Sequence, residues 1–241
     1  MQLKNLDETS TASAWDSKWS TIFDHYQKDL RHAHYMRALM HSDERKILEM
    51  AAGSFRDMAA LRRAGLDCHG MDFSGESIER AKANFPEFKE KIHQMSAFEM
   101  PFDNQFFDVS YHNGFWVLFS DENIRKLAQE QARITGKRMF ATVHNAHNRQ
   151  FVDYFDRLKK DDPLYDVRFF HVEDLTALMS EVCDDVQVIP VGKGKRRHED
   201  WLIKMGITHP LLLRSYLKIS GMQYLNSSER LLCVGTPRHA A

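Results

Sequence analysis

The chain has 241 residues, of which 43% are hydrophobic and 28% are charged, and its formal net charge is -1. This composition is ordinary for a soluble globular protein, and the length suits one α/β domain with additions. A near-neutral charge excludes long-range attraction to nucleic acid or anionic lipid, so we expect no nucleic-acid partner and no membrane surface.

Residues 1–44 are predicted to form an N-terminal helical arm. After a polar start, aromatic and apolar side chains recur at three- and four-residue spacing between Ala14 and Met40. This spacing places them on one helical face. Such a face can pack the arm onto the main domain or close as a lid over a ligand, and the two interpretations are compatible. Trp15, Trp19 and Tyr26 are the candidate lid residues.

Strand and helix signals alternate through residues 45–191. The predicted strands cover residues 46–50, 67–72, 92–95, 106–111, 138–143 and 186–191, with a last strand at 230–234. The predicted helices cover residues 56–64, 75–85, 121–134 and 173–182, with Ser74 as an N-cap and with Gly65 and Gly136 as helix stops. Strands separated by helices predict an α/β fold with a doubly wound, mostly parallel, seven-stranded sheet that is covered on both faces.

Residues 192–229 interrupt this alternation. Two apolar stretches, 201–205 and 211–217, predict a helical insertion before the last strand. A basic cluster precedes them; it could meet a phosphate or diphosphate on a substrate, or be a solvated loop. The cluster consists of Lys193, Lys195, Arg196, Arg197 and His198. We predict one domain, made of an arm (1–44), a core (45–191), an insertion (192–229) and a last strand with a tail (230–241).

The three cysteines, Cys68, Cys183 and Cys233, lie far apart in the sequence and form no CxxC pair. A sparse, odd set fits a reducing compartment better than a disulfide framework. The N-terminus lacks the apolar core of a signal peptide, and no apolar run reaches the ~20 residues that span a bilayer. We therefore expect a soluble, cytoplasmic protein. The oligomeric state is left open.

The stretch from Ile47 to Asp57 carries the strongest functional signal, because a buried strand runs into a small-residue turn that opens a helix. Small residues let the backbone approach a ligand, and the helix N-terminus offers free N–H groups. Glu49 ends the first strand. Asp72 ends the second strand, about twenty residues on, where an α/β nucleotide site holds ribose hydroxyls.

This pattern resembles class I, Rossmann-like, S-adenosylmethionine (SAM)-dependent methyltransferases, which carry an acidic residue followed by a glycine-rich turn. Glu49, Ala51, Gly53 and Phe55 fall on the four fixed positions of that motif. Ala51 and Phe55 replace glycines. A bulky Phe55 would hinder a pyrophosphate, so on steric grounds we favour SAM over a nicotinamide cofactor.

Further motifs extend the resemblance over residues 45–191 and the last strand. Asp72 followed by Phe73 is similar to the family's ribose- and adenine-binding pair. Ser96, Ala97 and Phe98 lie where the family's adenine-binding segment reads Asp-Ala, with Ser96 replacing the acidic residue. The resemblance implies SAM as the cofactor. It also implies these cofactor-binding residues: Glu49, Ala51, Gly53, Asp72, Phe73, Ser96, Ala97, Phe98, His112 and, from the arm, Trp19.

Methyl transfer to a hydroxyl needs a general base, most often His, Asp or Glu. The ligand crevice of a doubly wound sheet lies beyond the carboxyl ends of its strands, which makes His112, His144 and His147 the candidate catalytic residues. The His-x-x-His spacing of His144 and His147 could also bind a metal, but that loop lacks a carboxylate, so we expect no metal.

We therefore predict a SAM-dependent methyltransferase acting on a small-molecule or glycan-type (sugar-type) acceptor, with O-methylation slightly favoured over N-methylation. Two alternatives stay open at this stage. One is a SAM-binding module without turnover, since three motif positions depart from the family pattern. The other is a nicotinamide-dependent oxidoreductase.

Overall fold

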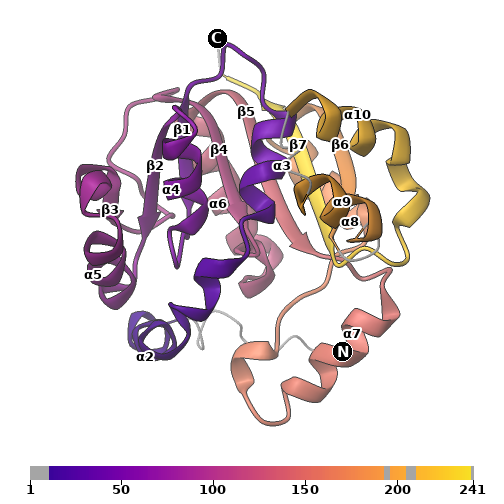
Figure 1. Cartoon of the computed structure of the whole chain (residues 1–241), viewed down its shortest axis with the longest axis horizontal. Coiled ribbons are helices and arrows are strands. Elements are labelled where there is room, and N and C mark those ends of the chain that lie inside the picture. The colour runs from indigo at the N-terminus through magenta and orange to yellow at the C-terminus, as the bar shows by residue number, and fades with distance from the viewer. Residues whose placement is uncertain (1–10, 193–195, 205–209, 240–241) are drawn as a thin grey trace.

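The computed structural model describes residues 11–192, 196–204 and 210–239 of the chain. A seven-stranded sheet with the strand order β3-β2-β1-β4-β5-β7-β6 forms its centre (Figure 1). The strands are β1 (Lys46–Met50), β2 (Asp67–Asp72), β3 (Ile92–Gln94), β4 (Phe107–Asn113), β5 (Thr135–His144), β6 (Cys183–Val191) and β7 (Arg230–Pro237). The first five strands pair in parallel, whereas β7 runs antiparallel to β5 and β6.

Helices connect these strands and flank the sheet. The α-helices are α2 (Ala12–Ile22), α3 (Arg31–Leu39), α4 (Arg56–Arg63), α5 (Gly75–Asn84), α6 (Asp121–Ile134), α7 (Arg149–Leu158), α8 (Val172–Ser180), α9 (Arg196–Lys204) and α10 (Pro210–Ser220). Short 3-10 helices are η1 (His25–Lys28), η2 (Pro86–Lys91), η3 (Trp116–Leu118), η4 (Pro163–Tyr165) and η6 (Gly221–Tyr224).

The sheet has an apolar cluster on each of its two faces. Successive side chains of a strand point to opposite faces, and Ile47 and Leu48 of β1 accordingly join two different apolar clusters. Helices α3, α4, α5 and α10 supply one cluster, and α6 and α8 supply the other. This three-layer arrangement confirms the predicted fold class.

Local signals placed several helix ends correctly. The Ser74 hydroxyl accepts a hydrogen bond from the Ser77 N–H (3.2 Å) and caps α5. Gly65 follows α4 with a φ of +85°, which is the left-handed conformation that ends many helices. The predicted stop at Gly136 was wrong, because α6 ends at Ile134 and Gly136 lies inside β5.

Other parts of the structure differ from the sequence prediction or extend it. In the arm, residues 11–44 form the helices α2 and α3, with η1 between them. Helix α7, after β5, was not predicted. The described residues of the insertion include the helices α9 and α10, and α10 packs against α3.

Two further predictions concern the surface of the molecule. Of the basic cluster, Lys193, Lys195 and the side chains of Arg196 and Arg197 lie outside the described residues, and His198 is exposed. Within the described part of the chain, no helix combines the length and the apolar character that crossing a bilayer requires.

Candidate functional site

Two adjoining cavities lie at the carboxyl ends of the parallel strands, where a doubly wound sheet binds its ligands. The main cavity has a volume of about 250 Å³ and is lined by the turn after β1, the ends of β4 and β5, the start of β7, and residues of α2 and α7. The side cavity, of about 210 Å³, lies beside β2 and β3. Ala51, Asp72, Phe73 and Phe115 line both cavities, so the two form one continuous site.

The turn between β1 and α4 passes through the left-handed region at alternate positions. Ala51, Gly53 and Phe55 have φ angles of 49°, 55° and 55°. A non-glycine residue in this region costs about 1–2 kcal/mol. The glycine-rich geometry is therefore retained although two of its three positions carry side chains.

Phe55 does not face the ligand site. Its side chain is fully buried and fills the space above Gly70 of β2, where an added Cβ would lie 2.6 Å from Phe55 Cδ1. Phe55 lines neither cavity. The steric argument from Phe55 against a pyrophosphate was therefore wrong, because that side chain belongs to the core.

Asp72 anchors the junction of the two cavities. Its two carboxylate oxygens accept hydrogen bonds from the Gly53 N–H (2.9 Å) and from the Ser74 N–H (3.0 Å). Burial raises the pKa of Asp72, and these backbone donors oppose the rise because they stabilise the charged form. Each oxygen keeps a further lone pair, which can accept a hydrogen bond from a hydroxyl group of a ligand.

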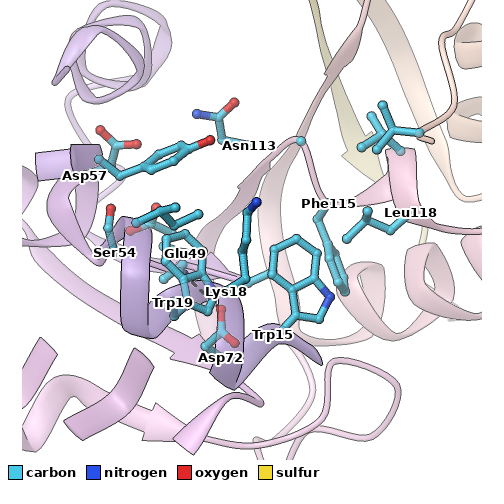
Figure 2. A pocket seen from close by; sticks show the side chains of 18 of the residues that line it. Trp15, Lys18, Trp19, Glu49, Ser54, Asp57, Asp72, Asn113, Phe115 and Leu118 are labelled. Carbon is cyan, nitrogen blue, oxygen red and sulfur yellow. Dashed lines mark hydrogen bonds between the residues drawn. The ribbon is translucent and has the colours of Figure 1, made fainter. Parts of the chain in front are cut away.

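Glu49 and Asp57 form a second acidic group, on the floor of the main cavity (Figure 2). Glu49 accepts a hydrogen bond from the Met58 N–H (2.8 Å) in the first turn of α4, where the helix dipole favours a negative charge. Burial and the neighbouring Asp57 raise the pKa of Glu49 well above its ordinary value. Burial also raises the pKa of Asp57, to about 6. Two buried acids in contact with one cavity favour a cationic or proton-donating ligand group.

Helix α2 crosses the opening of the main cavity and is fixed on both sides. Asp16 accepts hydrogen bonds from the Ser74 hydroxyl (2.5 Å) and from the Glu76 N–H (3.2 Å) at the start of α5. Lys18 pairs with Asp162, beyond α7, at 2.6 Å. Trp19 lies so close to Gly53 that an added Cβ there would be 2.2 Å from Trp19 Cζ2. The arm therefore bridges the cavity and packs directly onto the turn.

The side cavity is mostly apolar. Phe73, Ala97 and Phe98 line it together with Ser96, whose hydroxyl accepts a hydrogen bond from the Phe98 N–H (3.2 Å). Phe98 is 42% exposed, so its ring is available to a ligand. A flat apolar group attached to a diol held by Asp72 fits these surroundings.

Residues 47–137 match a family model described as a methyltransferase domain. The match begins in β1 and ends in β5, and it contains the turn, Asp72 and the side cavity. This segment is therefore similar to a methyltransferase domain, and the sheet that contains it has the strand order of the class I, Rossmann-like fold. The enzyme is expected to use SAM as its cofactor. No curated protein shows significant sequence similarity to the chain.

Solved structures of similar fold include several methyltransferases. A SAM-dependent methyltransferase from Thermotoga maritima, named as a possible histamine N-methyltransferase, is 16% identical and has a TM-score of 0.60, with 92% of this chain and 94% of that chain covered. A chain from the complex of the Haloferax volcanii Trm112 methyltransferase activator with its methyltransferase is 15% identical, with a TM-score of 0.60 and coverage of 99% and 100%.

A geranyl diphosphate C-methyltransferase from Streptomyces coelicolor A3(2), in complex with Mg²⁺, geranyl diphosphate and S-adenosyl-L-homocysteine, is 14% identical. Its TM-score is 0.56, and 86% of this chain and 78% of that chain are covered. At these identities the likeness concerns the fold.

All but one of the predicted cofactor-binding residues of the methyltransferase line the two cavities. Glu49, Ala51, Gly53, Asp72, Phe73 and Trp19 line the main cavity, and Ser96, Ala97 and Phe98 line the side cavity. The exception is His112, which lines neither.

The three candidate catalytic histidines separate in the structure. His144, the last residue of β5, lines the main cavity. His112 is fully buried on β4, with its ring 5.0 Å from that of Trp116. His147 lines neither cavity; its Nε2 accepts a hydrogen bond from the Val172 N–H (3.2 Å). Because His112 and His147 lie away from the cavities, His144 is the candidate that the geometry retains.

The structure also supplies the carboxylate that the loop of His147 lacks. His147, His171 and Glu173 each offer a ligand atom, and these atoms lie within 4.8 Å of one another. His171 and Glu173 are exposed at the start of α8, outside the two cavities. This cluster is therefore separate from the methyltransferase site.

Replacing His112 with leucine is expected to stabilise the protein more at pH 5.5 than at pH 7.5. Burial lowers the pKa of His112 from 6.5 to about 3, so the folded protein keeps it neutral while the unfolded chain protonates it below pH 6.5. Stability contributed by the neutral ring is therefore lost as the pH falls. The advantage of the variant should grow by ~1.4 kcal/mol between the two pH values.

Urea unfolding of both proteins at the two pH values measures this difference. A stability difference that does not change with pH would show that folded His112 takes up a proton and is more accessible than its burial indicates.

Sequence reasoning assigned no role to several residues of the site. Lys18, Arg56, Asp57 and Arg230 all line the main cavity. Of these, Arg56 and Asp57 immediately follow the turn, and their position in the first turn of α4 is a signal that could have found them. Arg230 lies far along the chain and reaches the site only through the pairing of β7 with β5.

Proposed function

We propose that the enzyme transfers the methyl group of SAM to a small-molecule or sugar-type acceptor, with oxygen favoured over nitrogen as the atom methylated. The observation that carries the proposal is the Asp72 carboxylate, held by two backbone donors where the two cavities meet. The side cavity next to Asp72 offers apolar walls for adenine, and the main cavity offers Glu49 and Asp57 for the cationic end of the cofactor. The small volumes of the cavities, about 250 and 210 Å³, favour a small acceptor.

The cofactor-binding residues follow from this placement. Asp72 accepts the ribose hydroxyls, and Phe73 and Phe98 flank adenine. Because the Phe98 N–H already donates to Ser96, we assign the Ala97 N–H to an adenine nitrogen. Glu49 and Asp57 lie on the side of the sulfonium and amino groups, and the Arg56 guanidinium lies beside them for the carboxylate.

His144 is the proposed proton acceptor. Its Nδ1 is buried without a hydrogen-bond partner among the described residues, and burial, together with the nearby Arg230, keeps its pKa well below the ordinary value. The ring is therefore neutral at physiological pH and can accept a hydrogen bond from an acceptor hydroxyl. As a weak base, it assists most where the hydroxyl is itself acidic, as in a phenol.

Helix α2 is proposed to act as the lid. Its contacts on both sides of the cavity and its packing on Gly53 would exclude water from the reacting atoms, which methyl transfer requires. A cytoplasmic location is also part of the proposal, since the three cysteines are free and buried.

Calorimetry with S-adenosylhomocysteine and with NAD tests the cofactor assignment directly. We expect binding of S-adenosylhomocysteine and no binding of NAD. Incubation with methyl-labelled SAM and a panel of hydroxyl- and amine-bearing metabolites then tests turnover. Tight cofactor binding without transfer to any panel member would favour a SAM-binding module without turnover, and binding of NAD alone would contradict the proposal.

A further inference from the structure

Arg230 places a guanidinium in the main cavity, beside the ends of β4 and β5. It begins β7 and pairs directly with His144, the last residue of β5. Residues directly opposite in an antiparallel pair point to the same face of the sheet, so the two side chains lie next to each other. Asn113 and Gly114 line the same part of the cavity.

Arg230 is half-buried, and one nitrogen of its guanidinium is buried and unsatisfied. Its Nη1 has no hydrogen-bond partner among the described residues. The charged and polar groups that act on it come from several elements: Glu229 next to it, Tyr26 and Asp29 of the arm, and Arg56 of α4. Arg56 repels it, and none of the others forms a described ion pair with it. A buried cation without a partner is costly, and an anionic ligand would remove that cost.

The side chains around Arg230 indicate what the rest of such a ligand is like. Phe155, Tyr165 and Val167 line this part of the cavity and are aromatic or apolar. The Phe151 ring lies 5.8 Å from the guanidinium carbon and supports its flat face. His144 stands beside the guanidinium with an unpartnered Nδ1. Around Arg230 the cavity thus offers a guanidinium and the ring of His144 among aromatic and apolar side chains.

We propose that Arg230 binds a carboxylate on the acceptor, which is a small aromatic or apolar acid whose nucleophilic atom faces His144. This inference rests on the proposed function and deepens it. SAM also carries a carboxylate, in its amino-acid part, and this group is the alternative partner for the Arg230 guanidinium. β7 is the third strand from β1, but the Arg230 side chain reaches back to the end of β4, where its Nη1 lies 3.5 Å from the position of an added Cβ at Gly114. Arg56, directly after the turn, is nearer to the cofactor's amino-acid end.

The test uses protein loaded with S-adenosylhomocysteine and pairs of small acids with their amides, such as 4-hydroxybenzoate with 4-hydroxybenzamide. Calorimetry gives the affinity of each probe for the wild type, Arg230→Met and Arg230→Lys. We expect the wild type to prefer at least one acid to its amide, Arg230→Met to lose that affinity roughly 10- to 100-fold, and Arg230→Lys to retain part of it. Arg125→Met, a change on the surface, is the matched control.

Two further measurements separate the possible roles of Arg230. The affinity for S-adenosylhomocysteine should stay within about twofold of the wild type in Arg230→Met. The melting temperature of the ligand-free variant should equal or exceed that of the wild type, because an unpartnered buried charge is removed. A lower melting temperature would assign Arg230 a structural role and overturn the proposal.

Three other outcomes would also overturn it. No acid of the panel binds better than its amide, acid binding is unchanged in Arg230→Met, or the variant loses the cofactor instead, which would assign Arg230 to the cofactor's carboxylate. If the wild type itself fails to bind S-adenosylhomocysteine, the proposed function falls and this inference falls with it.

Discussion

Replacing Asp72 with alanine is expected to weaken S-adenosylhomocysteine binding by about 100-fold or more while the protein stays folded. In the proposed complex the carboxylate accepts both ribose hydroxyls, and two hydrogen bonds to a charged group contribute about 3–6 kcal/mol. The same carboxylate accepts the N–H groups of Gly53 and Ser74, so the variant should also lose about 1–3 kcal/mol of stability. Calorimetry and urea unfolding measure the two effects separately.

Two comparisons make this result specific to the site. Asp72→Asn keeps the size of the side chain and one acceptor oxygen, so its affinity should lie between those of alanine and the wild type. Asp67, at the other end of β2, pairs with Arg62 and Lys91 away from both cavities, and Asp67→Ala should bind the cofactor normally. Wild-type affinity in Asp72→Ala would refute the assignment of Asp72 to the ribose.

The parts of the fold that the sequence predicts well are those with local causes. β2 was predicted with its observed bounds, because Gly65 ends the helix before it and the Ser74 cap begins the helix after it. The start of α5 follows from the Ser74 side chain alone. Helix α7 had a similar signal, a cap at Asn148 and apolar residues at Phe151 and Phe155, that was not used.

The site required information that no local pattern contains. Glu49 and Asp72 could be found because they lie at the carboxyl ends of two strands that are neighbours in the sheet. The side chain of Phe55 could not be oriented from sequence, because its place in the core depends on Gly70 of a different strand. Arg230 adjoins His144 only because β7 inserts antiparallel beside β5, and neither residue predicts that pairing. Likewise, the sequence does not show that His112 is buried, because its burial depends on how the helices pack on the sheet.

Replacing Gly53 with alanine is the second change with a large expected effect. Gly53 has a φ of +55°, where an alanine costs about 1–2 kcal/mol, and the new Cβ would also lie 2.2 Å from Trp19 Cζ2. The indole must move, and it is held by contacts with Trp15, Phe23 and Tyr26. We expect a total loss of about 2–4 kcal/mol and a cofactor affinity reduced at least ~10-fold as α2 is displaced.

Gly65 provides the matched control, because its φ is +85° and an added Cβ would meet nothing within 4 Å. Gly65→Ala should therefore show the backbone strain without the clash, and should leave cofactor binding unchanged. Adding Trp19→Ala to each glycine variant then isolates the contact. Since the smaller side chain removes the clash at Gly53 and does nothing at Gly65, only the Gly53 pair should show a coupling energy, of about 1–3 kcal/mol. Equal losses in Gly53→Ala and Gly65→Ala would mean that α2 does not pack on the turn in solution, and the lid would then have no structural basis.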